Sequence, residues 1–173
     1  MNHQQKAQAL LERFLSYLAI SSQSDPKVKE VPSTEGQWTM ARVLEAGLKE
    51  LGLKEVQVDQ HANVTAYLPG TVKNVPTVGF VAHVDTVDVG LSPDIHPQVI
   101  HYAGGDVCLN KEKDLWIRLK EHPELSAYVG QDIIFTDGTS VLGADNKSGV
   151  TNIMTALEIL ITEQIPHGDI RVA

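Results

Sequence analysis

Apolar and polar residues follow two different periods along this chain. Apolar residues recur every three or four positions over residues 3–19, 34–51 and 146–164, which is the spacing of one helical face. Gln37 follows Thr34 by three positions, as in a capping box, and Gly52 stands just after the second apolar stripe, where it can stop a helix. The pattern therefore predicts three amphipathic helices.

Strand-like segments lie between these helices. Apolar and polar residues alternate over residues 56–58 and 63–68, and residues 75–82 form the longest uncharged run. Such a run is typical of a central strand that is covered on both faces. Residues 170–173 begin another strand-like segment. Together the segments predict an α/β fold with a central, mostly parallel or mixed sheet that is flanked by helices.

Residues 90–142 have the weakest pattern. They contain short strand candidates at 98–102 and 132–136, and a charged stretch at 111–124 that suggests a helical turn. Glycine-containing turns separate these pieces. We interpret 90–142 as an insertion with an antiparallel hairpin, within a chain of 173 residues whose length suits one domain.

Composition narrows the class of protein. A formal charge of -8 and a pI of about 5.3 disfavour a nucleic-acid partner. The single cysteine, Cys108, excludes an internal disulfide and the zinc motifs built from paired cysteines. No apolar stretch approaches the roughly 18 residues of a membrane span, and the first twenty residues lack a signal-peptide core. A protein of the reducing cytoplasm without membrane partners is expected.

Candidate chemistry begins where the 75–82 run ends. His83 and Asp85 alternate along the strand, so their side chains are expected on the same face. They follow the carboxyl end of the strand, which is where open α/β sheets bind ligands. A neutral imidazole can bind zinc through one ring nitrogen, and a carboxylate can hold the other nitrogen.

Asp145 is the second candidate. It joins a strand-like end to the helix predicted over 146–164, where backbone N–H groups and the helix dipole favour an ionised carboxylate. Taken singly, a strand-end histidine or an aspartate before a helix also fits a purely structural role. Spacing alone does not separate Asp145 from four other nearby acids, which are Asp59, Asp88, Asp94 and Asp106. Five further histidines have no paired ligand pattern, and we interpret them as surface or loop residues: His61, His96, His101, His122 and His167.

Two segments taken together are more specific. "VGFVAHVDTVD" and "TDGTSVLGADNKSGV", with "GGDVCLN" between them, resemble the zinc-dependent exopeptidase family of aminoacylases and desuccinylases, and within it the tripeptide aminopeptidases. The resemblance covers the whole chain and implies two zinc ions per complete active site. It implies that His83 binds one zinc, that Asp145 bridges both, and that Asp85 is the catalytic acid that orients His83. It also implies a cis peptide bond between Asp145 and Asn146, the latter standing where many relatives have a second acid.

The resemblance further implies that metal-activated water releases the N-terminal residue from tripeptides, with the first glutamate of a Glu-Glu pair as general base. That pair and the remaining metal ligands have no counterpart in residues 1–173. We therefore expect the N-terminal portion of a zinc-binding catalytic domain, inactive alone and belonging to a longer, homodimeric enzyme.

Other functions remain open at this point. A carboxypeptidase, an aminoacylase or a desuccinylase would use the same chemistry on another substrate. A non-catalytic α/β binding module would use His83 and Asp145 as structural residues. A nucleotide-binding domain is disfavoured, because neither G-x-G-x-x-G nor G-x-x-x-x-G-K-[ST] occurs in the sequence. Cobalt and manganese also accept nitrogen and oxygen ligands, so the sequence leaves the working metal open.

Overall fold

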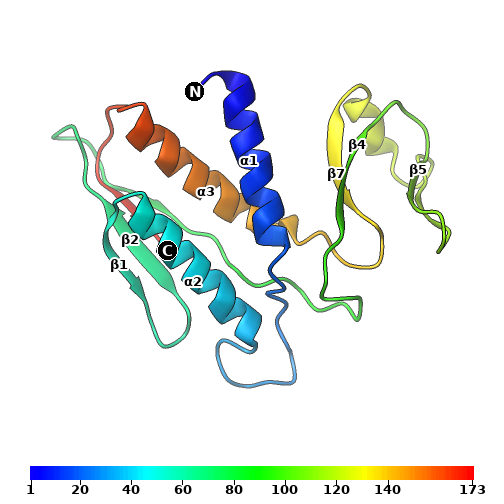
Figure 1. Cartoon of the computed structure of the whole chain (residues 1–173), viewed down its shortest axis with the longest axis horizontal. Coiled ribbons are helices and arrows are strands. Elements are labelled where there is room, and N and C mark those ends of the chain that lie inside the picture. The colour runs from blue at the N-terminus through cyan, green and yellow to red at the C-terminus, as the bar shows by residue number, and fades with distance from the viewer. The chain divides into compact units, whose positions relative to one another are not determined.

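The chain separates into two compact units in a computed structural model that describes residues 1–173 (Figure 1). The first unit comprises Met1–Asp88 and Gly143–Ala173, and the second comprises Val89–Leu142. The chain thus leaves the first unit after Asp88 and returns to it at Gly143.

Three helices belong to the first unit. Their bounds agree with the predicted helices to within two residues: α1 spans His3–Leu18, α2 spans Glu35–Glu50 and α3 spans Ala144–Thr162. The capping box of Thr34 and Gln37 is present at the start of α2, and Gly52 adopts a positive φ just after its end. None of the helices combines the length and the apolarity that crossing a membrane requires.

A mixed four-stranded sheet packs with these helices. Its strand order is β1-β2-β8-β3, with β1 at Lys54–Val58, β2 at Val64–Leu68, β8 at Ile170–Val172 and β3 at Val78–Phe80. β2 is antiparallel to both β1 and β8, whereas β3 is parallel to β8. The predicted α/β class with a mixed sheet and flanking helices is confirmed.

The core of the first unit lies between the helices and one face of the sheet. Alternate residues of β2 and β8 point into it because side chains on a strand alternate between faces. Its buried members from the strands and the helices are Val64, Ala66, Leu68, Ile170, Val172, Tyr17, Met40, Ala41, Leu44, Leu48, Val150, Met154 and Leu157. Burying one large apolar side chain of this kind contributes about 2 kcal/mol.

β3 does not occupy the predicted place in the sheet. The prediction of a central strand at 75–82 is wrong: β3 is three residues long, lies at an edge and pairs only with β8. Its side chains remain exposed, and Val81, just after it, is 80% exposed. An uncharged run is typical of a strand that is buried on both faces, but it does not specify which strands lie beside it. Within residues 1–173 the two interior positions belong to β2 and β8.

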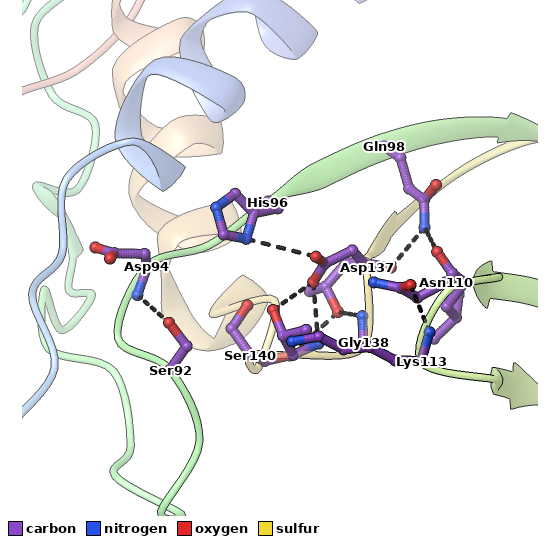
Figure 2. Close-up of polar contacts among 12 residues, drawn as sticks. Ser92, Asp94, His96, Gln98, Asn110, Lys113, Asp137, Gly138 and Ser140 are labelled. Carbon is purple, nitrogen blue, oxygen red and sulfur yellow. Dashed lines mark hydrogen bonds and ion pairs between the residues drawn. The ribbon is translucent and has the colours of Figure 1, made fainter.

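The second unit contains two antiparallel strand pairs. β4 (Pro97–His101) pairs with β7 (Asp132–Thr136), and β5 (Val107–Asn110) pairs with β6 (Leu115–Ile117). The Gln98 side chain joins the pairs by donating to the carbonyls of Leu109 and Thr136 at 3.0 and 2.8 Å (Figure 2). The core of the second unit consists of Tyr102, Val107, Leu125 and Phe135.

The charged stretch at 111–124 is mostly not helical. A turn and β6 occupy its first part, and a 3-10 helix, η1, begins only at Pro123 and ends at Tyr128. Three residues in that stretch, Leu115, Trp116 and Ile117, favour a strand, and the surrounding charges obscure this preference.

Candidate functional site

His83 lies where β3 stops pairing with β8. The Ala173 N–H donates to the Phe80 carbonyl at 3.0 Å, and the Ala82 N–H donates to the Ala173 carbonyl at 3.1 Å. His83 is the first residue beyond these hydrogen bonds, so its side chain leaves the sheet at the carboxyl end of a parallel strand. The side chain is half exposed.

The imidazole of His83 is held between two carboxylates. Its Nδ1 lies 3.1 Å from Asp85 Oδ1 and 3.1 Å from the Asp85 carbonyl oxygen. Its Nε2 lies 2.9 Å from Asp145 Oδ1. The structure thus brings together the three residues that the sequence singled out, although 62 positions separate His83 from Asp145.

The two carboxylates also control the charge of the ring. Partial burial lowers the pKa of His83, but the hydrogen bonds to Asp145 and Asp85 outweigh that effect and raise the pKa above its ordinary value. The site therefore favours positive charge at the ring. A bound cation at Nε2 would benefit from the same carboxylates.

Asp145 precedes the regular part of α3. Asp145 and Asn146 have non-helical backbone angles, and the peptide bond between them is cis, as the resemblance implies. Asn146 Oδ1 accepts from the Gly149 N–H at 3.2 Å and so caps the regular helix. A Cβ at Gly149 would lie 2.1 Å from Asn146 Oδ1, so a larger residue there would displace the capping side chain. The Asp145 carboxylate is left 95% exposed, facing His83.

The remaining acids and histidines lie elsewhere. Asp59 accepts hydrogen bonds from the backbone N–H groups of His61 and Asn63, in the turn between β1 and β2. In the second unit His96 Nδ1 lies 3.6 Å from Asp137 Oδ2, and the other oxygen of Asp137 accepts from Thr139 (Figure 2). His101–Asp132 and His122–Glu124 form exposed pairs of the same kind.

The donor atoms of the site fit part of a zinc site. Imidazole nitrogen and carboxylate oxygen are both zinc ligands. A catalytic zinc usually has three protein ligands, and residues 1–173 contain no group of three or more His, Cys, Asp or Glu side chains that could hold one ion. His83 and Asp145 can therefore supply two ligands, with Asp85 behind the ring.

An open pocket borders the site. Its volume is about 640 Å³, and His83 and Asp85 belong to its lining. Apolar side chains from α2, β2 and α3 form much of the rest, and the loop over residues 28–33 contributes to its rim. The pocket is large enough for an amino-acid side chain. Sequence periodicity did not predict it, because side chains from distant segments build its walls.

Two buried polar residues beside the site were also missed. Ser22 and Lys147 are both fully buried. Lys147 carries one signal in the sequence: it stands in the first turn of a predicted helix, where the helix dipole disfavours a cation. Ser22 carries no signal of its own.

Comparison with known proteins shows which proteins the chain resembles in sequence. No family model matches it. It is 54% identical over 167 residues to a peptidase T-like protein from Yersinia pestis, and 47% identical over 169 residues to peptidase T from Geobacillus thermodenitrificans. Each match covers 96% of this chain but only 40% and 41% of the relative, so the chain spans about two fifths of their length.

Solved structures show the same fold. A Staphylococcus aureus tripeptidase matches 95% of this chain with a TM-score of 0.63 and 25% identity, and 35% of that protein is covered. The aminopeptidase PepT from Bacillus cereus matches with the same coverage and TM-score at 24% identity. Along 96% of its length, therefore, this chain is similar in sequence to part of peptidase T and peptidase T-like proteins, and it shares its fold with part of the two solved structures.

Proposed function

We propose that this chain forms part of a zinc-dependent aminopeptidase that releases the N-terminal residue from tripeptides. The observation that carries the proposal is the imidazole of His83, held between Asp85 and Asp145 at the carboxyl end of a parallel strand. Homologues named peptidase T, and solved relatives described as an aminopeptidase and a tripeptidase, support the choice of substrate.

Each of the three residues has a distinct role in this proposal. His83 Nε2 and the Asp145 carboxylate would hold the metal, and the two oxygens of Asp145 would allow it to serve both zinc ions. Asp85 holds Nδ1, which fixes the ring and directs Nε2 toward Asp145, where the metal would lie. Bound zinc supplies an acidified water and polarises the scissile carbonyl.

The general base of this reaction must come from outside the three residues. The resemblance implies that the base is the first glutamate of a Glu-Glu pair, and residues 1–173 contain no such pair. We propose that residues 1–173 alone bind zinc weakly and do not hydrolyse tripeptides. The complete enzyme would hold two zinc ions, act in the cytoplasm and form a homodimer.

The test measures zinc binding and tripeptide hydrolysis for the 173-residue chain and for the complete enzyme, each with and without Asp145→Ala. The expected result is that the substitution weakens zinc binding by at least about tenfold in both proteins and abolishes hydrolysis in the complete enzyme. Asp132→Ala is a matched control, because it breaks an exposed His–Asp pair of similar geometry in the second unit.

Two outcomes would count against the proposal. If the complete enzyme binds no metal, and Asp145→Ala changes nothing, the three residues are structural and the chain is a binding module. If the 173-residue chain cleaves tripeptides in a chelator-sensitive way, the general base lies within it.

A further inference from the structure

Buried hydrogen bonds connect the two segments that carry the site. The Nζ of Lys147, two residues after Asp145, donates to the carbonyl of Ile20. Two residues beyond Ile20, Ser22 Oγ donates to the carbonyl of Val84 at 2.7 Å. Val84 stands between His83 and Asp85. The start of α3 is therefore joined, through residues 20–22, to the chain that follows β3.

The segment over residues 20–24 is held by backbone contacts as well. The Thr86 N–H donates to the Ser22 carbonyl at 3.1 Å, and the Ser24 N–H donates to the Thr86 carbonyl at 2.9 Å. On the α2 side, a Cβ on Gly36 would lie 1.7 Å from the Ser21 carbonyl oxygen, so α2 contacts the segment closely. The segment thus touches α2, α3 and the chain that follows β3.

Stability alone does not account for Lys147. Its side chain is fully buried, and burial of an ammonium group costs free energy. An apolar side chain of similar length would avoid that cost. What an apolar side chain could not supply is the hydrogen bond to Ile20.

We propose that Lys147 and Ser22 are positioning residues that set the separation between His83 and Asp145 through the segment 20–24. Metal ligands must be held within about 0.5 Å of their working geometry, and neither His83 nor Asp145 is buried deeply enough for packing to do this. This inference rests on the proposed function, in which these two residues are metal ligands.

Lys147→Met and Ser22→Ala test the inference in the 173-residue chain. Lys147→Met removes the donor and keeps the length of the side chain, so its unfolding temperature should stay the same or rise. Its Co²⁺ or Zn²⁺ affinity should fall by at least about tenfold, as when the residues behind a metal ligand are lost. The backbone amide NMR signals of residues 84–86 should shift in both variants.

Matched controls use the same substitutions elsewhere. Lys49→Met removes an exposed lysine that pairs with Glu45 one turn away. Ser16→Ala removes a hydroxyl that donates only to the nearby Arg13 carbonyl at 2.7 Å. Neither control should change metal affinity or the signals of residues 84–86.

The readouts separate the inference from the proposed function. If the unsubstituted chain binds metal and both variants bind it with the same affinity as that chain, Lys147 and Ser22 are merely structural and the inference is overturned. If the unsubstituted chain and the complete enzyme bind no metal, the proposed function fails. The amide signals then still decide whether the connection exists, because unchanged signals at 84–86 would refute it. Ser22→Ala carries the test if Lys147→Met does not fold.

Discussion

Gly36 lies where α2 meets the segment beside the site, and only a residue without a Cβ fits there. A Cβ would lie 1.7 Å from the Ser21 carbonyl oxygen and 2.8 Å from its carbon, and both are backbone atoms that a rotamer change cannot move. Gly36→Ala should therefore lower the free energy of unfolding by about 3 kcal/mol, measured by urea denaturation. Gly79→Ala is the control, since no atom lies within 4 Å of its added Cβ. Equal stabilities of the two variants would contradict this account.

Asp169 gives the first unit a dependence on pH. Its Oδ1 accepts from the Gly70 N–H at 2.7 Å and from the Tyr67 hydroxyl at 2.8 Å, and these hydrogen bonds, the Gly70 one first, hold the pKa of Asp169 below its ordinary value. A lowered folded-state pKa adds stability that is complete above the unfolded-state pKa, about 3.9, and is lost as the pH falls through the folded-state value.

Asp169→Asn should accordingly destabilise the chain at neutral pH and lose its effect in acid. Urea denaturation at pH 7 and at about pH 3 measures the difference. Asp94→Asn, at an exposed position in the second unit, provides the comparison. A destabilisation by Asp169→Asn that is the same at both pH values would rule out the electrostatic origin.

The residues of the candidate site differ in how far the sequence could predict them. Local features suggest His83, Asp85 and Asp145 as candidates, and the resemblance carried by the two segments together distinguishes them from the other acids and histidines. Lys147 and Ser22 could not be assigned in this way, because their hydrogen-bond partners lie 127 and 62 positions away in the sequence. A contact at such a separation leaves no periodic pattern.

At the scale of elements, the same distinction separates helices from strands. Helix periodicity arises within one segment, so all three helices could be predicted to within two residues. Strand order depends on partners remote in the sequence, and for that reason β3 was misplaced at the centre of the sheet. β5 and β6, of four and three residues, are too short to produce a clear alternation.

Helix α3 contributes Val150, Met154 and Leu157 to the core of the first unit, and Leu157 is the most buried of these three. The side chain is 1% exposed and belongs to the main apolar cluster. Leu157→Ala should lower the free energy of unfolding by about 3 kcal/mol, because it combines lost burial with a cavity. Chemical denaturation measures this change in the free energy of unfolding. Leu91→Ala, at an exposed position in the second unit, is the control. A loss below about 0.5 kcal/mol would show that α3 is not packed as described.

At the scale of the whole molecule, an uncharged strand edge is left open. Val78, Phe80 and Val81 are exposed along β3, and an apolar groove lies beside them against Ile153 and Leu160 of α3. Uncharged edge strands associate with one another. The chain should therefore self-associate as its concentration rises.

Val81→Lys should reduce this self-association, because a charge at an edge opposes strand pairing. Sedimentation velocity over a range of concentrations provides the measurement. Val129→Lys adds the same charge at an exposed position of the second unit and should have little effect. A chain that stays monomeric throughout, or an equal effect of the two substitutions, would refute the role of β3.

The position of β8 has a consequence for synthesis on the ribosome. Within residues 1–173, β8 follows β1, β2 and β3 in the sequence, yet it alone joins β2 to β3. Until residues 170–172 leave the exit tunnel, the nascent chain holds a β1–β2 hairpin and a separate strand with nothing between them. His83 and Asp145 are translated well before the sheet that orients them can close, so the candidate site takes shape only after β8 has emerged.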